Sequence, residues 1–461
     1  MCHAPLVDLL IDYLGQTQAP FYFPGHKRGQ GADPALLAVL GKNLFSLDLP
    51  ELPGIDQVTQ ASESLAAQCY GVDHTWFLVN GATVGIQAAL LSVPGELILV
   101  GGNAHRSTIA GLILSGQIPV FLPCDLEPES GLDLGVNPAT LEHYLQNYAA
   151  KAVLLVSPNY FGVVGEIKAL VETIHRYKAI AIIDAAHGAH LGFHPDLPQG
   201  AIAAGADLVI HSSHKMLTSL SQSAMLHLQG DRLDPSQLSQ ALGLLQTSSP
   251  NLILLASLDA ARYQLQTHGF SLLDQTLSLA HQTRSELQAI AHLQLIDLPN
   301  LDPTRHTHNL TQLGLTGFGL DQLLRQQHRV IAELPTFQHL VFALGIGTTQ
   351  HDTQALVASL GHLPADLPPL PTAPPLPPPP SLSLSPRQAY LAPSQVVEFS
   401  QSAGQISQEI ICPYPPGIPI LFPGQRISPE AIAYLQQIQA LGGQISGASD
   451  PTLARIRVTK C

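Results

Sequence analysis

The sequence predicts an α/β fold in which a mainly parallel sheet of about seven strands is wrapped on both faces by helices, with a smaller α/β domain after it. Short apolar runs rich in Val, Ile and Leu alternate with segments of helical periodicity from residue 76 to residue 228. Most of these runs stop at small, polar or titratable residues. The 461-residue chain is 45% hydrophobic, which is enough for two or three domains with one large core.

The expected strands are short and apolar, and they cover residues 76–79, 97–100, 120–122, 152–156, 179–183, 208–211 and 224–228. Helices are expected between them. Asp56 can cap a helix that ends near Tyr70, and Asn137 can cap one whose first residue is Pro138, a favoured helix start. Before the sheet, residues 6–14 also show helical spacing.

A long helical pattern at residues 252–293 predicts a helix that joins the sheet to a second domain, where strand-like runs occur at 330–334 and 339–344. Residues 363–386 are densely proline-rich and predict a semi-rigid linker. We expect an N-terminal arm with a lip over a site at 21–29 (FYFPGHKRG), a large domain built on the sheet, a small α/β domain, a linker and a C-terminal subdomain. Their expected boundaries are 1–55, 56–295, 296–362, 363–388 and 389–461.

Composition argues against several classes of protein. The 20 Lys and Arg residues against 34 Asp and Glu give a net charge of −14, which argues against a nucleic-acid partner and suits a cationic small molecule. Five scattered cysteines show no paired spacing, so a reducing, cytoplasmic setting is expected. Asp8 and Asp12 interrupt the N-terminal apolar stretch, which argues against a signal peptide. No apolar run reaches the ~18 residues of a membrane span.

Polar residues gather at the expected carboxyl ends of the strands, where open parallel sheets bind ligands. They are Asn80–Thr83, His105, Ser157–Tyr160, Asp184 and Ser212–Lys215. The turn at Gly81, Ala82 and Thr83 opens a helix, whose free backbone N–H groups and positive dipole end suit a phosphate. Ordinary strand-to-helix turns look the same, so this turn by itself does not establish a phosphate site.

Lys215 follows an expected buried strand in the stretch ADLVIHSSHKML (206–217). A lysine at this place, flanked by Ser212, Ser213 and His214, can be desolvated enough to lower its pKa and to act as an amine nucleophile. The alternative is a surface lysine that merely follows a strand.

The stretch DAAHGAHLGFH (184–194) contains His187, His190 and His194 at helical spacing, which raises the question of a metal site. Two glycines and a following proline argue against a helix, and no glutamate lies in the cluster, so we expect no metal. The preferred interpretation pairs Asp184 with a protonated ring nitrogen of a ligand and places His187 beside the same ring. His190 and His194 are then hydrogen-bonded structural residues.

With Asp184 and Lys215 on neighbouring strand ends, the chain resembles the pyridoxal-phosphate enzymes of the aspartate-aminotransferase fold (fold type I). It is most similar to the short form of the Orn/Lys/Arg decarboxylase family. The stretches that carry the resemblance span nearly the whole chain. They are FPGHKRG (23–29), LPELPGID (49–56), LVNGATVGIQAAL (78–90), SPNYFGVVGEI (157–167), DAAHGAHLGFH (184–194), SSHKML (212–217), QTSSPNLILLASLD (246–259) and YPPGIPILFPG (414–424).

The resemblance implies a role for each candidate residue. Lys215 would hold pyridoxal 5′-phosphate as a Schiff base, and Asp184 would pair with the pyridinium nitrogen so that the ring accepts the electrons released at Cα. His105 would stack on the ring, and His187 would lie near the phenolic oxygen or the substrate. The positions expected to hold the phosphate are Ala82, Thr83, Ser212 and His214, with Gly81 in the same turn.

The resemblance also implies the reaction, which is decarboxylation of lysine, arginine or ornithine to CO2 and a di- or polyamine. In the family the active sites form at a dimer interface, so we expect a homodimer or larger homo-oligomer, with Thr247–Ser249 reaching across it. Two alternatives stay open. One is an aminotransferase or lyase that uses the same cofactor, in which Arg426 or Arg457 binds the α-carboxylate. The other is a degenerate homologue that only binds or regulates.

Three departures from the family pattern bear on activity. Ala185 stands where the family has a glutamate, and Gly101–Gly102 stand where it has a charged pair. Gln425 replaces an acidic residue that helps the family to recognise a cationic side chain. We expect cofactor binding to survive these changes, whereas the identity of the basic amino acid stays open.

Overall fold

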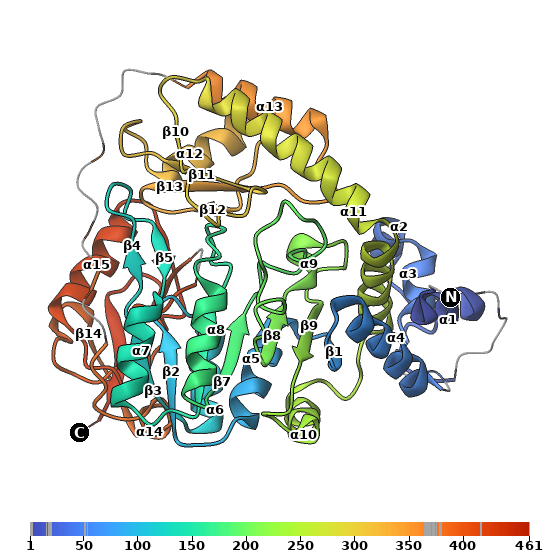
Figure 1. Cartoon of the computed structure of the whole chain (residues 1–461), viewed down its shortest axis with the longest axis horizontal. Helices are drawn as coiled ribbons and strands as arrows, with labels where there is room; N and C mark the ends of the chain where they lie inside the picture. The colour runs from blue at the N-terminus through green and yellow to red at the C-terminus, as the bar shows by residue number, and fades with distance from the viewer. Residues whose placement is uncertain are drawn as a thin grey trace.

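The computed structural model describes residues 3–14, 21–49, 54–363, 380–414 and 417–460, and the single positions 16, 52, 370, 374, 376 and 377. A central sheet lies among helices, with a smaller sheet above it, the N-terminal helices on one side and the C-terminal segment on the other (Figure 1). Part of the expected proline-rich linker lies outside the described residues. None of the helices in these ranges combines the length and the apolar character that crossing a lipid bilayer requires.

The large domain is built on a seven-stranded sheet, as predicted. Its strands are β1 (His74–Leu78), β2 (Leu97–Gly101), β3 (Ile118–Leu122), β6 (Ala152–Val156), β7 (Ile180–Asp184), β8 (Leu208–His211) and β9 (Ala224–Leu228). Their spatial order is β1-β9-β8-β7-β6-β2-β3, and β9 alone runs antiparallel to its neighbours in this fully described sheet. The carboxyl ends of the other strands therefore meet at one edge of the sheet.

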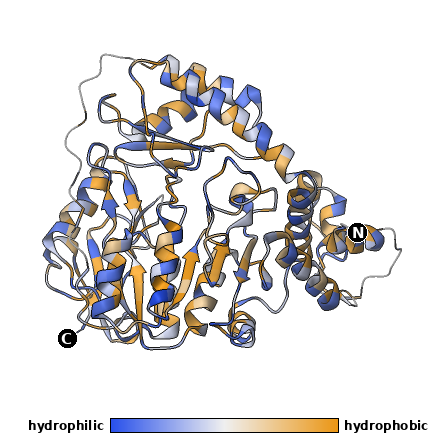
Figure 2. Ribbon diagram, in the orientation of Figure 1, coloured by the Kyte–Doolittle hydropathy of each residue, from blue (hydrophilic) through white to orange (hydrophobic). Residues whose placement is uncertain are grey.

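Both faces of this sheet are buried, which explains why its strands read as continuous apolar runs (Figure 2). In β6, Ala152 and Leu154 belong to the apolar core on one face, and Val153 and Leu155 belong to the core on the other. Successive side chains of a strand point to opposite faces. The helices packed around the sheet are α4 (Ile55–Tyr70), α5 (Gly81–Ser92), α6 (Arg106–Ser115), α7 (Pro138–Asn147), α8 (Ile167–Arg176) and α10 (Pro235–Leu245).

The start of α4 differs from the prediction. Gly54, not Asp56, is its N-cap residue, with φ = 80° and no capping side chain. The turn before this helix requires the positive φ that glycine adopts at low cost, so Asp56 falls in the first turn, where its charge faces the positive helix end. The predicted cap of α7 is confirmed, because Asn137 Oδ1 accepts a hydrogen bond from the backbone N–H of Thr140 at 2.7 Å.

The N-terminal arm comprises α1 (Pro5–Leu14), α2 (Pro34–Leu40) and α3 (Lys42–Leu47). The expected lip at 21–29 packs on this arm. His26 meets the ring of Phe45 at 5.2 Å between centroids, and the Arg28 guanidinium lies 5.1 Å from the ring centroid of Tyr13. The role of this segment as a lip stays a prediction.

The small domain follows α11 (Leu252–Gln288), which is shorter than the predicted helix. Its antiparallel sheet has the order β10-β11-β13-β12. Of the strand expected at 330–334 only Leu334 lies in a strand, which continues to Pro335; Arg329, just before the expected run, has φ = 57° and so turns the backbone there. The elements are β10 (Gln294–Leu295), β11 (Arg305–Asn309), α12 (Gly317–Leu323), η1 (Leu324–His328), β12 (Leu334–Pro335), β13 (His339–Ala343) and α13 (Gln350–Gly361).

The C-terminal segment has its own apolar core around Phe399, Leu435 and Ile456. It also packs on the large domain, where Phe422 meets Phe121 of β3 at 5.1 Å between ring centroids. Its elements are α14 (Pro386–Leu391), β14 (Ser394–Glu398), η2 (Phe399–Gln401), β15 (Cys412–Tyr414), α15 (Pro429–Ala440), β16 (Gln444–Ser446) and β17 (Arg455–Thr459). The short strands β4 (Asp125–Leu126) and β5 (Asp133–Gly135) pair beside the large sheet.

Candidate active site

Asp184 and Lys215 are brought together by two adjacent parallel strands. Asp184 is the last residue of β7 and pairs in register with Ile210 of β8. The chain then leaves β8 and forms the short helix α9 (Ser213–Met216), which carries Lys215. The two side chains are close enough for each charge to shift the pKa of the other. The strand ends that the sequence predicted to converge therefore do so.

Lys215 is in contact with His187, because its Nζ lies 3.1 Å from the His187 Nε2. The lysine is accessible to solvent although protein surrounds it on most sides. This partial removal from water lowers the pKa of Lys215, while Asp184 and Glu333 oppose the shift and Arg305 adds to it. An amine with a lowered pKa that a ligand can reach is suited to nucleophilic chemistry.

Asp184 is almost fully buried, with a relative exposure of 5%. Its Oδ1 accepts a hydrogen bond from the backbone N–H of Ala186 at 3.2 Å, and no donor within the described residues bonds its Oδ2. Burial raises the pKa of Asp184, and the charge of Lys215 opposes that shift. A buried carboxylate with a free oxygen is stabilised by a cationic partner, which a protonated ring nitrogen provides.

The predicted phosphate turn lies beside α9, because both are tied to one turn before β9. The backbone N–H of Gly81 donates to the carbonyl of Gln222 at 2.8 Å. The His214 Nδ1 bonds the carbonyl of the next residue, Ser223, at 2.9 Å. In the part of the chain that the structure describes, no protein acceptor pairs with the backbone N–H groups of Ala82 and Thr83. These two donors are therefore available to an anion.

Ser212 and Ser213 add hydroxyl groups at the same place. Both are buried, at 3% and 0% relative exposure. The Oγ of Ser213 has no hydrogen-bond partner among the described residues. A buried hydroxyl without a partner costs free energy, so an acceptor from a bound group would stabilise it.

His105 is the N-cap residue of α6, at the end of the turn that follows β2. Its Nδ1 accepts from the backbone N–H of Ser107 at 3.3 Å and lies 2.9 Å from the Ser107 Oγ. Burial, together with the charges of Lys215 and Arg106, lowers the pKa of His105 to about 4. The ring is therefore neutral near pH 7.

Two further residues reach the site: Arg305, which the sequence did not single out, and Tyr160, which was among the polar residues expected at the strand ends. The Nη2 of the fully buried Arg305 lies 3.0 Å from the Nδ1 of His187. The ring of Tyr160 meets that of His187 edge to face, at 5.2 Å between centroids. The sequence could have indicated Arg305. Cationic residues are scarce in this chain, with 20 Lys and Arg in total, and an arginine inside a strand-like run is unusual.

The proposed α-carboxylate arginines do not contact these residues. Arg426 Nη1 donates to the carbonyl of Gly404 at 2.6 Å, and Arg457 lies on β17, where its backbone N–H donates to Glu409. Gln425 is buried at 4% exposure, and its Oε1 has no partner among the described residues.

The other departures from the family pattern have local reasons. Ala185 is buried in the apolar core, where a carboxylate would be desolvated. A Cβ at Gly102 would stand 2.9 Å from the carbonyl oxygen of Leu122, so this backbone excludes a side chain there. Thr247, expected across a dimer interface, donates its backbone N–H to the Asn80 Oδ1 of its own chain at 3.2 Å.

The three histidines of 184–194 do not share a helix face, because this stretch forms turns. The His190 Nε2 lies 3.0 Å from the Asp302 Oδ2, and the His194 Nε2 lies 3.6 Å from the Asp274 Oδ1. Only His187 points to Lys215. Across the described residues, no group of three or more His, Cys, Asp or Glu side chains is placed to hold a metal ion.

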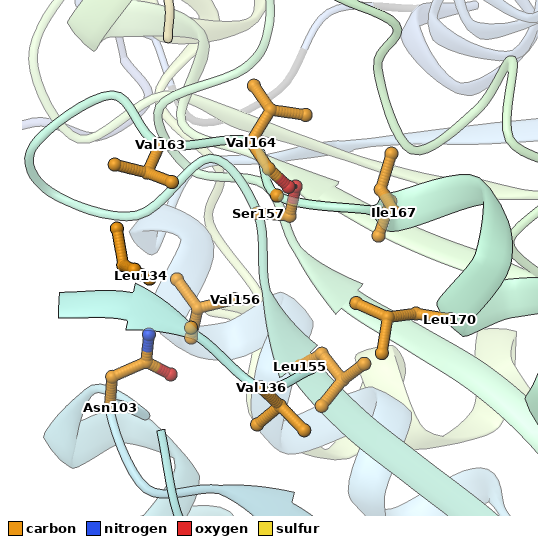
Figure 3. Close-up of a pocket in the computed structure, with 12 residues that line it drawn as sticks. Asn103, Leu134, Val136, Leu155, Val156, Ser157, Val163, Val164, Ile167 and Leu170 are labelled. Carbon is orange, nitrogen blue, oxygen red and sulfur yellow. The ribbon is translucent and has the colours of Figure 1, made fainter. Parts of the chain in front are cut away.

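A small internal cavity lies next to the site but is separate from it (Figure 3). Its volume is ≈ 10 Å³, about that of one water molecule. Ser157 and Asn103 border it, and the other lining side chains are apolar, including Leu155, Val164 and Leu170. It is too small for an amino-acid substrate.

Comparison with known proteins agrees with this geometry. The family model of the Orn/Lys/Arg decarboxylase major domain matches residues 4–307, and that of the C-terminal domain matches residues 378–450. The arginine decarboxylase of Bacillus anthracis is 33% identical, with 99% of this chain and 97% of that protein covered. The arginine decarboxylase of Halalkalibacterium halodurans is 34% identical, with the same coverage of both chains. The crystal structure of the Francisella novicida lysine decarboxylase has a TM-score of 0.81 at 19% identity, covering 100% of this chain and 81% of that one, which shows the same fold.

The cofactor and reaction expected from the sequence follow from these relationships. The buried carboxylate, accessible lysine, open helix start and unpartnered buried hydroxyl fit pyridoxal phosphate, and the fold is that of fold type I enzymes. The protein is a pyridoxal-phosphate-dependent decarboxylase of a basic amino acid. The chain thus belongs to the Orn/Lys/Arg decarboxylase family.

Proposed function

We propose that the substrate is L-arginine, which the protein converts to CO2 and agmatine. The observation that carries this proposal is the 33–34% identity, over 99% of the chain, to three bacterial arginine decarboxylases. The solved lysine decarboxylases share the fold at 18–19% identity, and this level does not bear on the substrate.

The bound cofactor supplies an electron sink for the pair of electrons left at Cα when CO2 departs. Asp184 would keep the ring nitrogen protonated through its negative charge, and His105 would pack on the ring. Lys215 would hold the cofactor through its Nζ. Its Nζ and the His187 Nε2 are 3.1 Å apart, so this pair can deliver the proton that replaces the carboxylate at Cα.

The phosphate is held, in our proposal, by the backbone N–H groups of Ala82 and Thr83 in the turn that Gly81 opens. Ser212 and Ser213 supply hydroxyl groups beside it. His214 uses Nδ1 for the carbonyl of Ser223, so in its neutral form the Nε2 can only accept. His214 therefore donates to the phosphate only when both ring nitrogens carry protons.

Glu333 is our candidate for the group that pairs with the guanidinium of arginine. It is exposed, and its backbone N–H bonds the carbonyl of Val341, so it stands at the start of β12 in the small domain. Its charge opposes the lowering of the Lys215 pKa, which supports a position for Glu333 at the open side of the site. A carboxylate there would supply the recognition that Gln425 cannot.

We propose that the protein is a homodimer or larger homo-oligomer in which the N-terminal arm packs on a second copy. Helix α2 buries none of its side chains within this chain. Its exposed apolar residues Leu36, Val39 and Leu40 lie close in sequence to exposed Phe21 and Phe23. Such a patch is unusual on a monomer. Sedimentation of wild type and of Val39→Lys tests this proposal, since a monomeric wild type would contradict it.

The five-part division of the chain stays a proposal, supported by separate apolar clusters in the small sheet and in the C-terminal segment. A reducing, cytoplasmic setting is likewise proposed, and it accords with the free thiols of Cys124 and Cys412.

The substrate is tested with purified protein and each of L-arginine, L-lysine and L-ornithine, with CO2 and amine measured together. We expect kcat/KM for arginine to exceed the other two by at least about tenfold. Lys215→Ala should abolish both products and the visible absorbance of the cofactor. A preference for lysine or ornithine would refute arginine as the substrate, and a keto acid without CO2 would point to the aminotransferase alternative.

A further inference from the structure

Arg305 belongs to the small domain, and its side chain extends into the site. It begins β11 and has a relative exposure of 1%. Its Nη2 lies 3.0 Å from the Nδ1 of His187 and 3.1 Å from the Sδ of Met216. Gly162 makes this reach possible, because a Cβ there would stand 2.5 Å from the Cγ of Arg305.

The hydrogen-bond chain Arg305–His187–Lys215 admits one arrangement of protons. A guanidinium has donors only, so the Nδ1 of His187 must accept from Arg305. A neutral imidazole with an accepting Nδ1 carries its proton on Nε2. That N–H then donates to the Nζ of Lys215, 3.1 Å away, and only a neutral amine has the lone pair to accept it.

The other two states of His187 are disfavoured by the same contact. The tautomer with its proton on Nδ1, and the doubly protonated ring, would each turn an N–H toward the N–H groups of Arg305. Arg305 stays charged under all ordinary conditions. Asp302 provides a counter-charge nearby: although burial alone would raise the pKa of Asp302, His190 and Arg305 lower it to about 2.

We infer that Arg305 is a positioning residue that keeps the proton of His187 on Nε2 and thereby holds the Nζ of Lys215 as a neutral amine. The consequence is a lysine ready to take up the cofactor. The lone pair of a neutral Nζ adds to an aldehyde carbon. A C=N bond then replaces the C=O bond, and both amine hydrogens leave with the oxygen as one water.

Other titratable groups that face Lys215 also affect whether its Nζ is protonated. They are Asp184 on β7, His105 at the start of α6 and Glu333 before β12. The two carboxylates favour an ammonium, whereas limited access of water and Arg305 favour the neutral amine. Arg305 is the member of this set that also contacts His187 directly.

The test measures cofactor uptake, not decarboxylation. The cofactor is removed from the full-length protein, pyridoxal 5′-phosphate is added back, and its attachment is followed by visible absorbance between pH 6 and pH 10. In Arg305→Met we expect the midpoint of the pH–rate curve to rise by about one pH unit or more, which slows attachment at pH 7 about tenfold. Arg305→Lys, which keeps a donor-only cation, should restore the midpoint.

The matched control is Arg284→Met. Arg284 lies on α11 and bonds the carbonyl of Ile296 at 2.6 Å and Asp297 at 2.9 Å, so it serves the same domain without touching His187. The midpoint of the pH–rate curve for cofactor attachment in Arg284→Met should equal that of wild type. A wild-type midpoint in folded Arg305→Met would overturn the inference, because a purely structural arginine would leave the midpoint where it is.

A measurement on wild type covers the case in which Arg305→Met does not fold. In protein labelled with ¹⁵N-histidine, the signal that disappears in His187→Gln should show a proton on Nε2 and none on Nδ1 from pH 6 to pH 9. A protonated Nδ1 would overturn the inference. The inference rests on the proposed role of Lys215 but not on arginine as the substrate, so failure of the arginine assay leaves both readouts intact.

Discussion

A methyl group on Gly417 would stand 3.3 Å from the Cδ2 and the Nε2 of His105. The carbonyl of Gly417 also accepts the backbone N–H of Arg106 at 3.1 Å. The C-terminal segment is thereby hydrogen-bonded to the start of α6. It contacts the ring of His105, which we expect to pack on the cofactor. The C-terminal segment of the chain is therefore part of the wall of the active site.

Gly417→Ala should weaken cofactor binding. Gly417 has φ = 88°, so alanine costs about 1–2 kcal/mol of stability through backbone strain, and its methyl group also presses on His105. Gly404→Ala is the matched control, since Gly404 has φ = 82° and a methyl group added there would have no neighbour within 4 Å. We expect a similar loss of stability in both, but about a tenfold rise in the cofactor dissociation constant in Gly417→Ala alone. Equal cofactor affinities would contradict the contact with His105.

Asp184→Asn should retain the cofactor and lose turnover. An amide has nearly the same shape but cannot keep the ring nitrogen protonated, so we expect kcat to fall by about 100-fold or more. CO2 release and visible absorbance on one sample separate turnover from binding. Asp133→Asn is the control, because Asp133 is a half-buried carboxylate at the start of β5 that accepts a hydrogen bond from the Asn103 Nδ2 at 2.8 Å. Turnover near wild type in Asp184→Asn would refute the role of Asp184.

Acid should destabilise the protein between pH 6.5 and pH 4. Burial lowers the pKa of five histidines to about 3 or 4, namely His105, His211, His306, His308 and His339. Each stays neutral in the folded state while the unfolded chain binds a proton, so stability falls as pH falls through this window, by about 1.4 kcal/mol per histidine at pH 5.5.

Glu63 works in the opposite direction, because burial raises its pKa to about 7 and its neutral form stabilises the fold as pH falls. The histidines outnumber it, so the melting temperature should be lower at pH 5.5 than at pH 7.5. His308→Phe, which places an apolar ring against Phe342, should reduce this difference. A melting temperature independent of pH over this range would show that these rings are not held neutral.

Glu333→Gln should raise KM for arginine by about tenfold or more and change kcat less, because the lost charge lies at the open side of the site and away from Cα. The same assay with Glu286→Gln, a carboxamide substitution at a half-buried residue of α11, controls for the change in net charge. An unchanged KM in Glu333→Gln would remove it as the guanidinium partner.

The strands and their polar ends could be predicted from the sequence because parallel strands buried on both faces are uninterrupted apolar runs with sharp limits. Asp184 and Lys215 were recognised in this way. The strand expected at 330–334 was placed too early, since its apolar pattern is short and the backbone turns at Arg329, which has φ = 57°.

What the sequence by itself determined is the arrangement of elements: local periodicity and turn residues decide where strands and helices begin and end, and these place Asp184, His187 and Lys215 at one edge. The tertiary structure alone decided what contacts them. Arg305 and His187 are 118 residues apart, and their contact depends on how the small sheet packs on the large one. No local pattern encodes that packing, because it results from the fit of two separately formed apolar surfaces.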